Sequence, residues 1–229
     1  MHIDPVGVLV NFVAIILSLT VHEFAHAKVA DHMGDPTPAR HGRLNLNPLT
    51  LIRAHPFGAL LMPLIGALNG FLIGWAATPV NPRLVRRQYT LRQADFWISI
   101  AGPLSNVLLA LLCALTLHLT DPALLGAELG KLLRPVHHLS AVMVLTNVFL
   151  ALFNLIPVPP FDGFSVLASA APRELRWAVQ FIEERANLLI LFVFFFGGRL
   201  LSPLIFTLAH LLIDLGELLL SPLHALLSL

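Results

Sequence analysis

Residues 6–26 read Val-Gly-Val-Leu-Val-Asn-Phe-Val-Ala-Ile-Ile-Leu-Ser-Leu-Thr-Val-His-Glu-Phe-Ala-His, an apolar run of membrane length that ends in two histidines and a glutamate. Ionisable groups at bilayer depth are costly and usually mark a functional site. On an α-helix, residues i and i+4 lie one turn apart on nearly the same face, so His22 and His26 can point toward one zinc ion. Glu23 lies on the same half of the helix, where it can accept a proton from a metal-bound water.

The composition predicts a polytopic membrane protein. Hydrophobic residues make up 57% of the 229 residues, charged residues only 12%, and the mean hydropathy is +0.81. A soluble domain is about one-quarter charged, so the expected surroundings are a lipid bilayer, in this case the cell membrane. The net charge of +1 gives no field that would attract nucleic acid. Cys113 lies in an apolar run and reads as a small buried hydrophobe.

The apolar blocks predict five or six transmembrane helices in a single membrane domain that covers residues 1–229. The core motifs fall within 6–170, and helices at 187–229 complete the domain. A segment at 172–186 reads as an amphipathic surface helix. The blocks are 6–30, 57–77, 94–119, 139–156, 187–213 and 215–229.

Two loops bear on the orientation in the membrane. Loops 27–56 and 78–93 each hold four Lys or Arg residues. They lie on opposite sides if 57–77 crosses the bilayer, and the positive-inside rule then gives no direction.

Residues 40–47 alternate in polarity, with Arg43, Asn45 and Asn47 on one face and Leu44 and Leu46 on the other. Alternation with a period of two predicts a short β-strand, bounded here by Pro38 and Pro48. The expected fold is therefore all-α with one short strand or surface hairpin after the first helix.

A catalytic zinc needs three protein ligands and an open position, so two histidines leave one ligand to be found. Asp162 is the best candidate, because three prolines in residues 157–160 break the preceding helix at membrane depth. Irregular backbone at that depth occurs only where it is buried or lines a wet cavity. The alternative is a turn-forming Asp-Gly at a helix end.

Two asparagines in the apolar blocks are further candidates. Asn154 either donates to the oxyanion of the attacked carbonyl or bonds between helices. Asn106 contributes to helix packing or contacts the substrate. The remaining histidines are not predicted to bind the metal.

These residues resemble the site-2 protease family of intramembrane zinc metalloproteases (peptidase family M50). The resemblance rests on His22-Glu-Phe-Ala-His26, on Ala101-Gly-Pro-Leu-Ser-Asn106, and on Asn154 followed by Pro-Val-Pro-Pro-Phe-Asp162-Gly163. Gly34-Asp-Pro-Thr-Pro-Ala-Arg40 and Leu44-Asn-Leu-Asn-Pro48 resemble the compact members without PDZ or CBS domains. Residues 51–58 depart from the pattern that many members show after the Asn-Pro pair.

The resemblance implies a zinc metalloprotease with His22, His26 and Asp162 as ligands, Glu23 as general base and Asn154 as a substrate or oxyanion contact. It implies single-pass transmembrane proteins as substrates, cut within or near the membrane after local unwinding. The substrate then adds as a strand to an exposed edge, for which 40–47 is the candidate. Asn45 and Asn106 are candidate substrate contacts. The alternatives are a catalytically silent module that binds membrane proteins, and a metal transporter.

Overall fold

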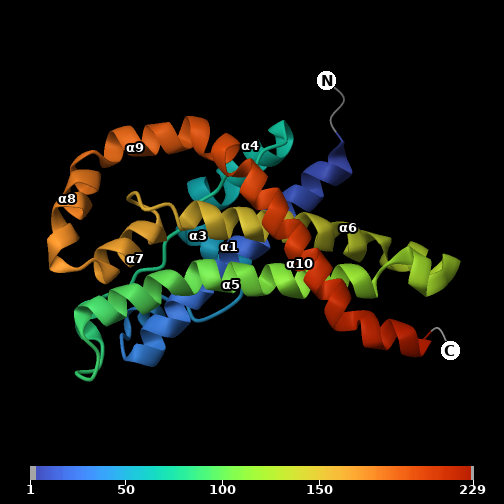
Figure 1. The fold of residues 1–229 in the computed structure, drawn as a ribbon, viewed down its shortest axis with the longest axis horizontal. Helices are drawn as coiled ribbons and strands as arrows, with labels where there is room; N and C mark the ends of the chain where they lie inside the picture. Colours follow the sequence, from blue (N-terminus) through green and yellow to red (C-terminus); the bar gives the residue numbers. More distant parts are fainter. Residues whose placement is uncertain (1–3, 228–229) are drawn as a thin grey trace.

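The structure is a computed structural model that describes residues 4–227. Figure 1 shows α5 and α6 lying side by side, with α10 crossing them. All regular elements within the described residues are helical. The α-helices are α1 (Pro5–Met33), α2 (Thr37–Arg40), α3 (Pro48–Ala54), α4 (Met62–Asn69), α5 (Leu91–Leu119), α6 (Pro122–Asn154), α7 (Asp162–Ala170), α8 (Arg176–Glu184), α9 (Ala186–Phe192) and α10 (Gly198–Leu227). Two π-helical turns, Phe57–Leu61 and Val193–Gly197, and two 3₁₀ turns, Pro82–Leu84 and Arg173–Leu175, lie between them.

Four helices within the described residues are long and apolar enough to cross a membrane. They are Pro5–Met33, Leu91–Leu119, Glu128–Asn154 and Ala186–Pro222. The chain is thus an all-α, multi-pass membrane protein, but the predicted count of five or six spans is not confirmed. The block 57–77 forms only a short helix, Phe57–Asn69, of about 20 Å at 1.5 Å per residue. The last two predicted blocks join in one continuous helical stretch.

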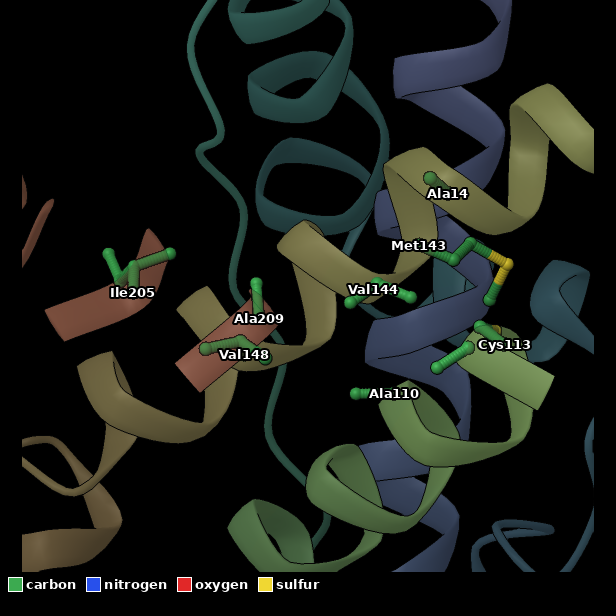
Figure 2. Packing of buried hydrophobic residues seen from close by; sticks show 9 residues of the cluster. Ala14, Ala110, Cys113, Met143, Val144, Val148, Ile205 and Ala209 are labelled. Atoms are coloured by element: carbon green, nitrogen blue, oxygen red, sulfur yellow. The ribbon is translucent and has the colours of Figure 1, made fainter. Parts of the chain in front are cut away.

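The bundle core lies where α1, α5, α6 and α10 meet, and Figure 2 shows its side chains. Ala14, Ala110 and Ala114 are fully buried and let the helix backbones approach closely, as small residues do in membrane bundles. Larger side chains fill the space between them, and the cluster as a whole is Ala14, Ala110, Cys113, Ala114, Met143, Val144, Val148, Ile205 and Ala209. This core fixes the position of α1 against α5 and α6.

The segment between α1 and α5 leaves and returns at the same end of α1. The fully buried Asp35 accepts hydrogen bonds from the backbone N–H of Thr37 at 2.9 Å and of Asn81 at 2.6 Å. The backbone N–H of Arg86 donates to the carbonyl oxygen of Met33 at 2.8 Å. Residues 37–81 therefore begin and end at the same end of α1, and they are called the re-entrant segment below because a chain with this path would enter and leave a bilayer on one side.

The predicted strand at 40–47 is wrong, since no strand occurs within residues 4–227. The asparagines of the alternating pattern bond locally instead. Asn45 donates to the carbonyl oxygen of Gly42 at 2.6 Å and accepts from the N–H of Asn47 at 2.9 Å. Asn47 accepts from the N–H of Leu49 at 3.0 Å and caps α3, which Pro48 starts. Such Asx turns and N-caps compete with strand pairing.

Candidate metal centre

Three side chains from two distant parts of the chain converge on one point inside the bundle. His22 and His26 lie on α1 and are 3% and 8% exposed, and Asp162 is the first residue of α7. The two Nε2 atoms lie 3.0 Å apart. Oδ2 of Asp162 lies 3.2 Å from Nε2 of His22 and 3.3 Å from Nε2 of His26. Within the described residues, this is the set of His, Cys, Asp and Glu side chains that could hold a metal ion.

The break between α6 and α7 brings Asp162 to the histidines. Helix α6 ends at Asn154, and the prolines that follow cannot continue it. Gly163 packs on the exit of α6, because a Cβ at this position would lie 2.7 Å from the carbonyl oxygen of Ile156 and closer to that of Leu155. A larger residue would push the first turn of α7, and with it Asp162, away from α1.

Helix α5 covers the other side of the histidine pair. A Cβ on Gly102 would lie 2.6 Å from Nε2 of His22 and closer still to Nε2 of His26. The missing side chain therefore leaves room for the ligand atoms and for an ion between them. Pro103 follows in the same tightly packed turn and is fully buried.

The second nitrogen of each imidazole is held by an oxygen acceptor. Nδ1 of His22 lies 2.6 Å from Oδ1 of Asn106, and Nδ1 of His26 lies 2.6 Å from the carbonyl oxygen of Ile98. Both acceptors lie on α5. An imidazole that donates its Nδ1–H in this way presents the lone pair of Nε2 to the ion, which is the usual support of a zinc-ligating histidine.

The donor set fits a zinc ion. Zinc binds His nitrogen and carboxylate oxygen at about 2.0–2.1 Å in tetrahedral geometry, which places neighbouring ligand atoms about 3.3 Å apart. The three separations of 3.0, 3.2 and 3.3 Å match this spacing. Oδ2 of Asp162 is buried and has no hydrogen-bond partner among the described residues. Lone pairs at such short separations repel one another unless a metal ion or a proton lies between them.

Glu23 lies beside this set with a free carboxylate oxygen. The side chain is 7% exposed, and its buried Oε2 has no hydrogen-bond partner in the described part of the chain. It lines a polar cavity of about 10 Å³, which is near the minimum that holds one water. The other lining residues are Thr20, Phe24, Arg43, Asn45, Asn47, Thr50, Leu51 and Thr78.

The three asparagines predicted from the sequence lie in different surroundings. Asn106 is fully buried, and its Oδ1 contacts Nδ1 of His22. Asn154 is half-buried, and its Nδ2 donates to the carbonyl oxygen of Leu150 in its own helix at 2.9 Å. Asn45 lines the small cavity next to Glu23.

Sequence reasoning missed four residues that support the site. Asn147 and Ser18 belong to the hydrogen-bond chain behind Asn106, Gly102 packs on the imidazoles, and Thr78 bonds to the backbone of Glu23. Two signals were present in the sequence. Asn147 interrupts an apolar block, and Ser18 precedes His22 by one helical turn.

A family model for peptidase family M50 matches residues 10–197. The chain belongs to peptidase family M50. All three candidate ligands and Glu23 lie inside the matched range, so the M50 match and the geometry refer to the same part of the molecule.

Curated relatives agree with this M50 membership, and each is named a putative zinc metalloprotease. YwhC of Bacillus subtilis is 34% identical over 197 residues, which are 84% of each chain. Rip2 of Mycolicibacterium smegmatis is 36% identical over 165 residues, 71% of this chain and 58% of that protein. MJ0611 of Methanocaldococcus jannaschii is 33% identical over 106 residues, 44% of this chain and 50% of that protein. No solved structure matches the chain.

Proposed function

We propose that this M50 family member is an intramembrane zinc endopeptidase that hydrolyses peptide bonds within or near transmembrane segments of single-pass proteins in the cell membrane. The observation that carries the proposal is the convergence of two imidazoles and one carboxylate at 3.0–3.3 Å with the free carboxylate of Glu23 beside them. This is the ligand count of a catalytic zinc site, which keeps a fourth position open.

The roles of the side chains follow from their chemistry. His22, His26 and Asp162 would hold the zinc ion, which when bound supplies Lewis acidity and acidifies a water. Glu23 accepts the proton of the attacking water at Oε2 and passes it to the leaving amine nitrogen. The small cavity next to Glu23 is large enough for one water, although none of the three candidate metal ligands lines it. Burial in the bundle excludes other water and strengthens each electrostatic interaction in the site.

Two asparagines are proposed as substrate contacts. Asn154 ends the helix that leads into the Asp162 loop, and its amide would donate to the carbonyl oxygen that gains negative charge. Asn45, which lines the Glu23 cavity, would contact the substrate backbone. The geometry of Asn106 favours a part in holding His22 instead.

The re-entrant segment provides a candidate edge for the substrate. Residues 71–81 have no regular secondary structure. The backbone N–H of Trp75 donates to Gly58, and that of Ala77 bonds to His55. In an extended chain alternate N–H groups point to opposite sides, so an extended path through this stretch would turn the N–H of Ala76 away from these partners. An unwound substrate adds its backbone there as a strand, which lets a protease reach amides that a helix hides.

The test uses the purified chain in liposomes with a single-pass membrane protein as substrate. The wild type is expected to bind one zinc ion per chain and to cut the substrate. Glu23→Gln is expected to keep zinc and lose cleavage by at least about 100-fold, the usual contribution of a general base. Asp162→Ala is expected to lose both. Equal cleavage by wild type and Glu23→Gln would contradict the mechanism, and zinc binding without cleavage of any membrane protein would indicate a binding module.

A further inference from the structure

A chain of polar side chains crosses the bundle behind His22. Ser18 lies on α1, Asn106 on α5 and Asn147 on α6, and all three are 0% exposed. Polar groups buried in an apolar bundle cost free energy unless they are hydrogen-bonded. Here the bonds link three helices and end on His22, a proposed zinc ligand. They can therefore determine which nitrogen of His22 carries the proton.

The backbone of α6 decides which way the Asn147 amide points. Its Nδ2 lies 2.8 Å from the carbonyl oxygen of Met143 and 2.9 Å from Oγ of Ser18. A backbone carbonyl can only accept, so the atom beside it must be the NH₂ group. The oxygen of the Asn147 amide therefore faces α5, where it lies 2.7 Å from Nδ2 of Asn106.

The orientation of the Asn147 amide determines the orientation of the Asn106 amide, and through it the position of the proton on His22. Oδ1 of Asn147 can only accept, so the Asn106 amide turns its NH₂ group toward it. The carbonyl oxygen of Ser18 adds a weak contact to the same NH₂ at 3.4 Å. Oδ1 of Asn106 then faces Nδ1 of His22 at 2.6 Å. Nδ1 must carry the proton, and Nε2 keeps its lone pair for the ion.

We propose that Asn147 is a positioning residue that sets the metal-binding tautomer of His22 through Asn106. The proposal rests on the zinc site of the proposed function. The two histidines differ in this respect. His26 donates to the backbone carbonyl of Ile98, which cannot exchange donor for acceptor, whereas an amide side chain can rotate by half a turn and do so.

The expected consequence of losing Asn147 follows from this difference. Only the 3.4 Å contact to Ser18 would remain to orient the Asn106 amide. A rotated amide presents its NH₂ group to Nδ1 of His22, which favours the tautomer with the proton on Nε2. That tautomer has no lone pair for the ion, so Asn147→Leu weakens zinc binding although Asn147 touches no ligand.

The experiment measures the zinc affinity of the purified full chain by competition with a chelator. Asn147→Leu is expected to lower the affinity about 10–100-fold, the usual effect of losing a residue that supports a metal ligand. Thr146→Val is the matched control. Thr146 is the neighbouring fully buried polar residue, and within the described part of the chain its hydroxyl bonds only to Val142 of its own helix. Its loss should therefore leave the affinity within about twofold of wild type.

A double variant separates this role from simple helix packing. In Asn106→Asp the side chain has two oxygens and no donor, so it accepts from Nδ1 of His22 in either orientation. Asn147 then no longer affects the tautomer of His22. The double variant Asn106→Asp, Asn147→Leu is therefore expected to bind zinc at least about tenfold more tightly than Asn147→Leu alone. A merely structural role for Asn147 predicts equal losses with Asn or Asp at position 106.

The outcomes distinguish the inference from the proposed function. A wild-type chain without stoichiometric zinc overturns the proposed function itself. Zinc binding by the wild type with an unchanged affinity in Asn147→Leu, or without recovery in the double variant, overturns only the role of Asn147. Should Asn147→Leu fail to fold, Asn147→Ser keeps a hydroxyl for the carbonyl of Met143 but is too short to reach Asn106. The same loss of affinity is then expected.

Discussion

The hydroxyl of Thr78 donates to the backbone carbonyl oxygen of Glu23 at 3.0 Å, across 55 positions of sequence. This bond joins the end of the re-entrant segment to the helical turn that carries the proposed general base. The residues just before Thr78 form the proposed substrate edge. The bond therefore helps to fix the position of that edge along α1 relative to the metal centre.

Thr78→Val is expected to lower the rate of cleavage while zinc binding stays unchanged. Loss of one such hydrogen bond costs about 1 kcal/mol, which corresponds to a rate roughly fivefold lower if the edge is displaced in the transition state. The measurement is cleavage of a membrane substrate at saturating zinc. Thr116→Val is the control, because Thr116 bonds to its own helix at Leu112. Full activity of Thr78→Val would argue against a role for this bond.

Ala76→Pro is expected to abolish strand addition without disturbing the metal centre. Proline removes the N–H of residue 76, which is proposed to bond to the substrate, and it is tolerated in extended backbone. Cleavage of a transmembrane substrate should fall by at least about tenfold, since a strand loses a ladder bond and meets the proline ring. Zinc content should equal that of the wild type. Cleavage at the wild-type rate would show that the substrate binds elsewhere.

Gly102→Ala is expected to weaken zinc binding. The added methyl group would occupy the space next to both Nε2 atoms, and overpacking in a tight core costs about 1–3 kcal/mol even without a metal. Zinc affinity should fall at least about tenfold, the lower limit expected when ligand positions are disturbed. Gly198→Ala provides the control, because a Cβ there meets no atom within 4 Å. Normal zinc content in Gly102→Ala would contradict the packing described here.

The candidate metal ligands could be picked out from the sequence because few ionisable residues lie in its apolar blocks. Two of them, His22 and His26, have helical spacing, and Asp162 follows a stretch of prolines that cannot remain helical. Ionisable residues in such surroundings are costly and therefore informative. The structure places their ligand atoms together. The supporting residues were harder to predict, since the contacts of Asn147 depend on how three helices pack.

One prediction was wrong and one was not confirmed, each for an identifiable reason. The alternation of Arg43, Asn45 and Asn47 suits a strand, but Asn also forms Asx turns and helix caps, and here those local bonds prevail. The block 57–77 has the hydropathy of a span, yet hydropathy does not reveal where the chain returns. The hydrogen bond from the backbone N–H of Asn81 to Asp35 holds the returning chain at the end of α1. It joins residues 46 positions apart, so local hydropathy cannot reveal it.

The re-entrant path leads to a prediction for the orientation of the chain in the membrane. Residues 28–43 hold three Lys or Arg residues and residues 83–92 hold four, whereas residues 120–140, at the opposite end of α5, hold two. Because the first two stretches lie at the same end of α1, their charges add rather than cancel. The positive-inside rule then places that end in the cytoplasm. His26 precedes Met33 by seven residues, so the metal centre lies about 10 Å along α1 from this end, at 1.5 Å per residue.

Labelling with a membrane-impermeant maleimide checks the orientation. In a Cys113→Ala background, Gln88→Cys reports on the basic end and Glu128→Cys on the opposite end; both side chains are exposed. In intact cells Glu128→Cys should react, whereas Gln88→Cys should react only after the membrane is opened. The Cys113→Ala chain without an added cysteine should stay unlabelled throughout. The reverse pattern would place the metal centre near the outer surface, and labelling of both positions in intact cells would show that the two ends do not lie on opposite sides.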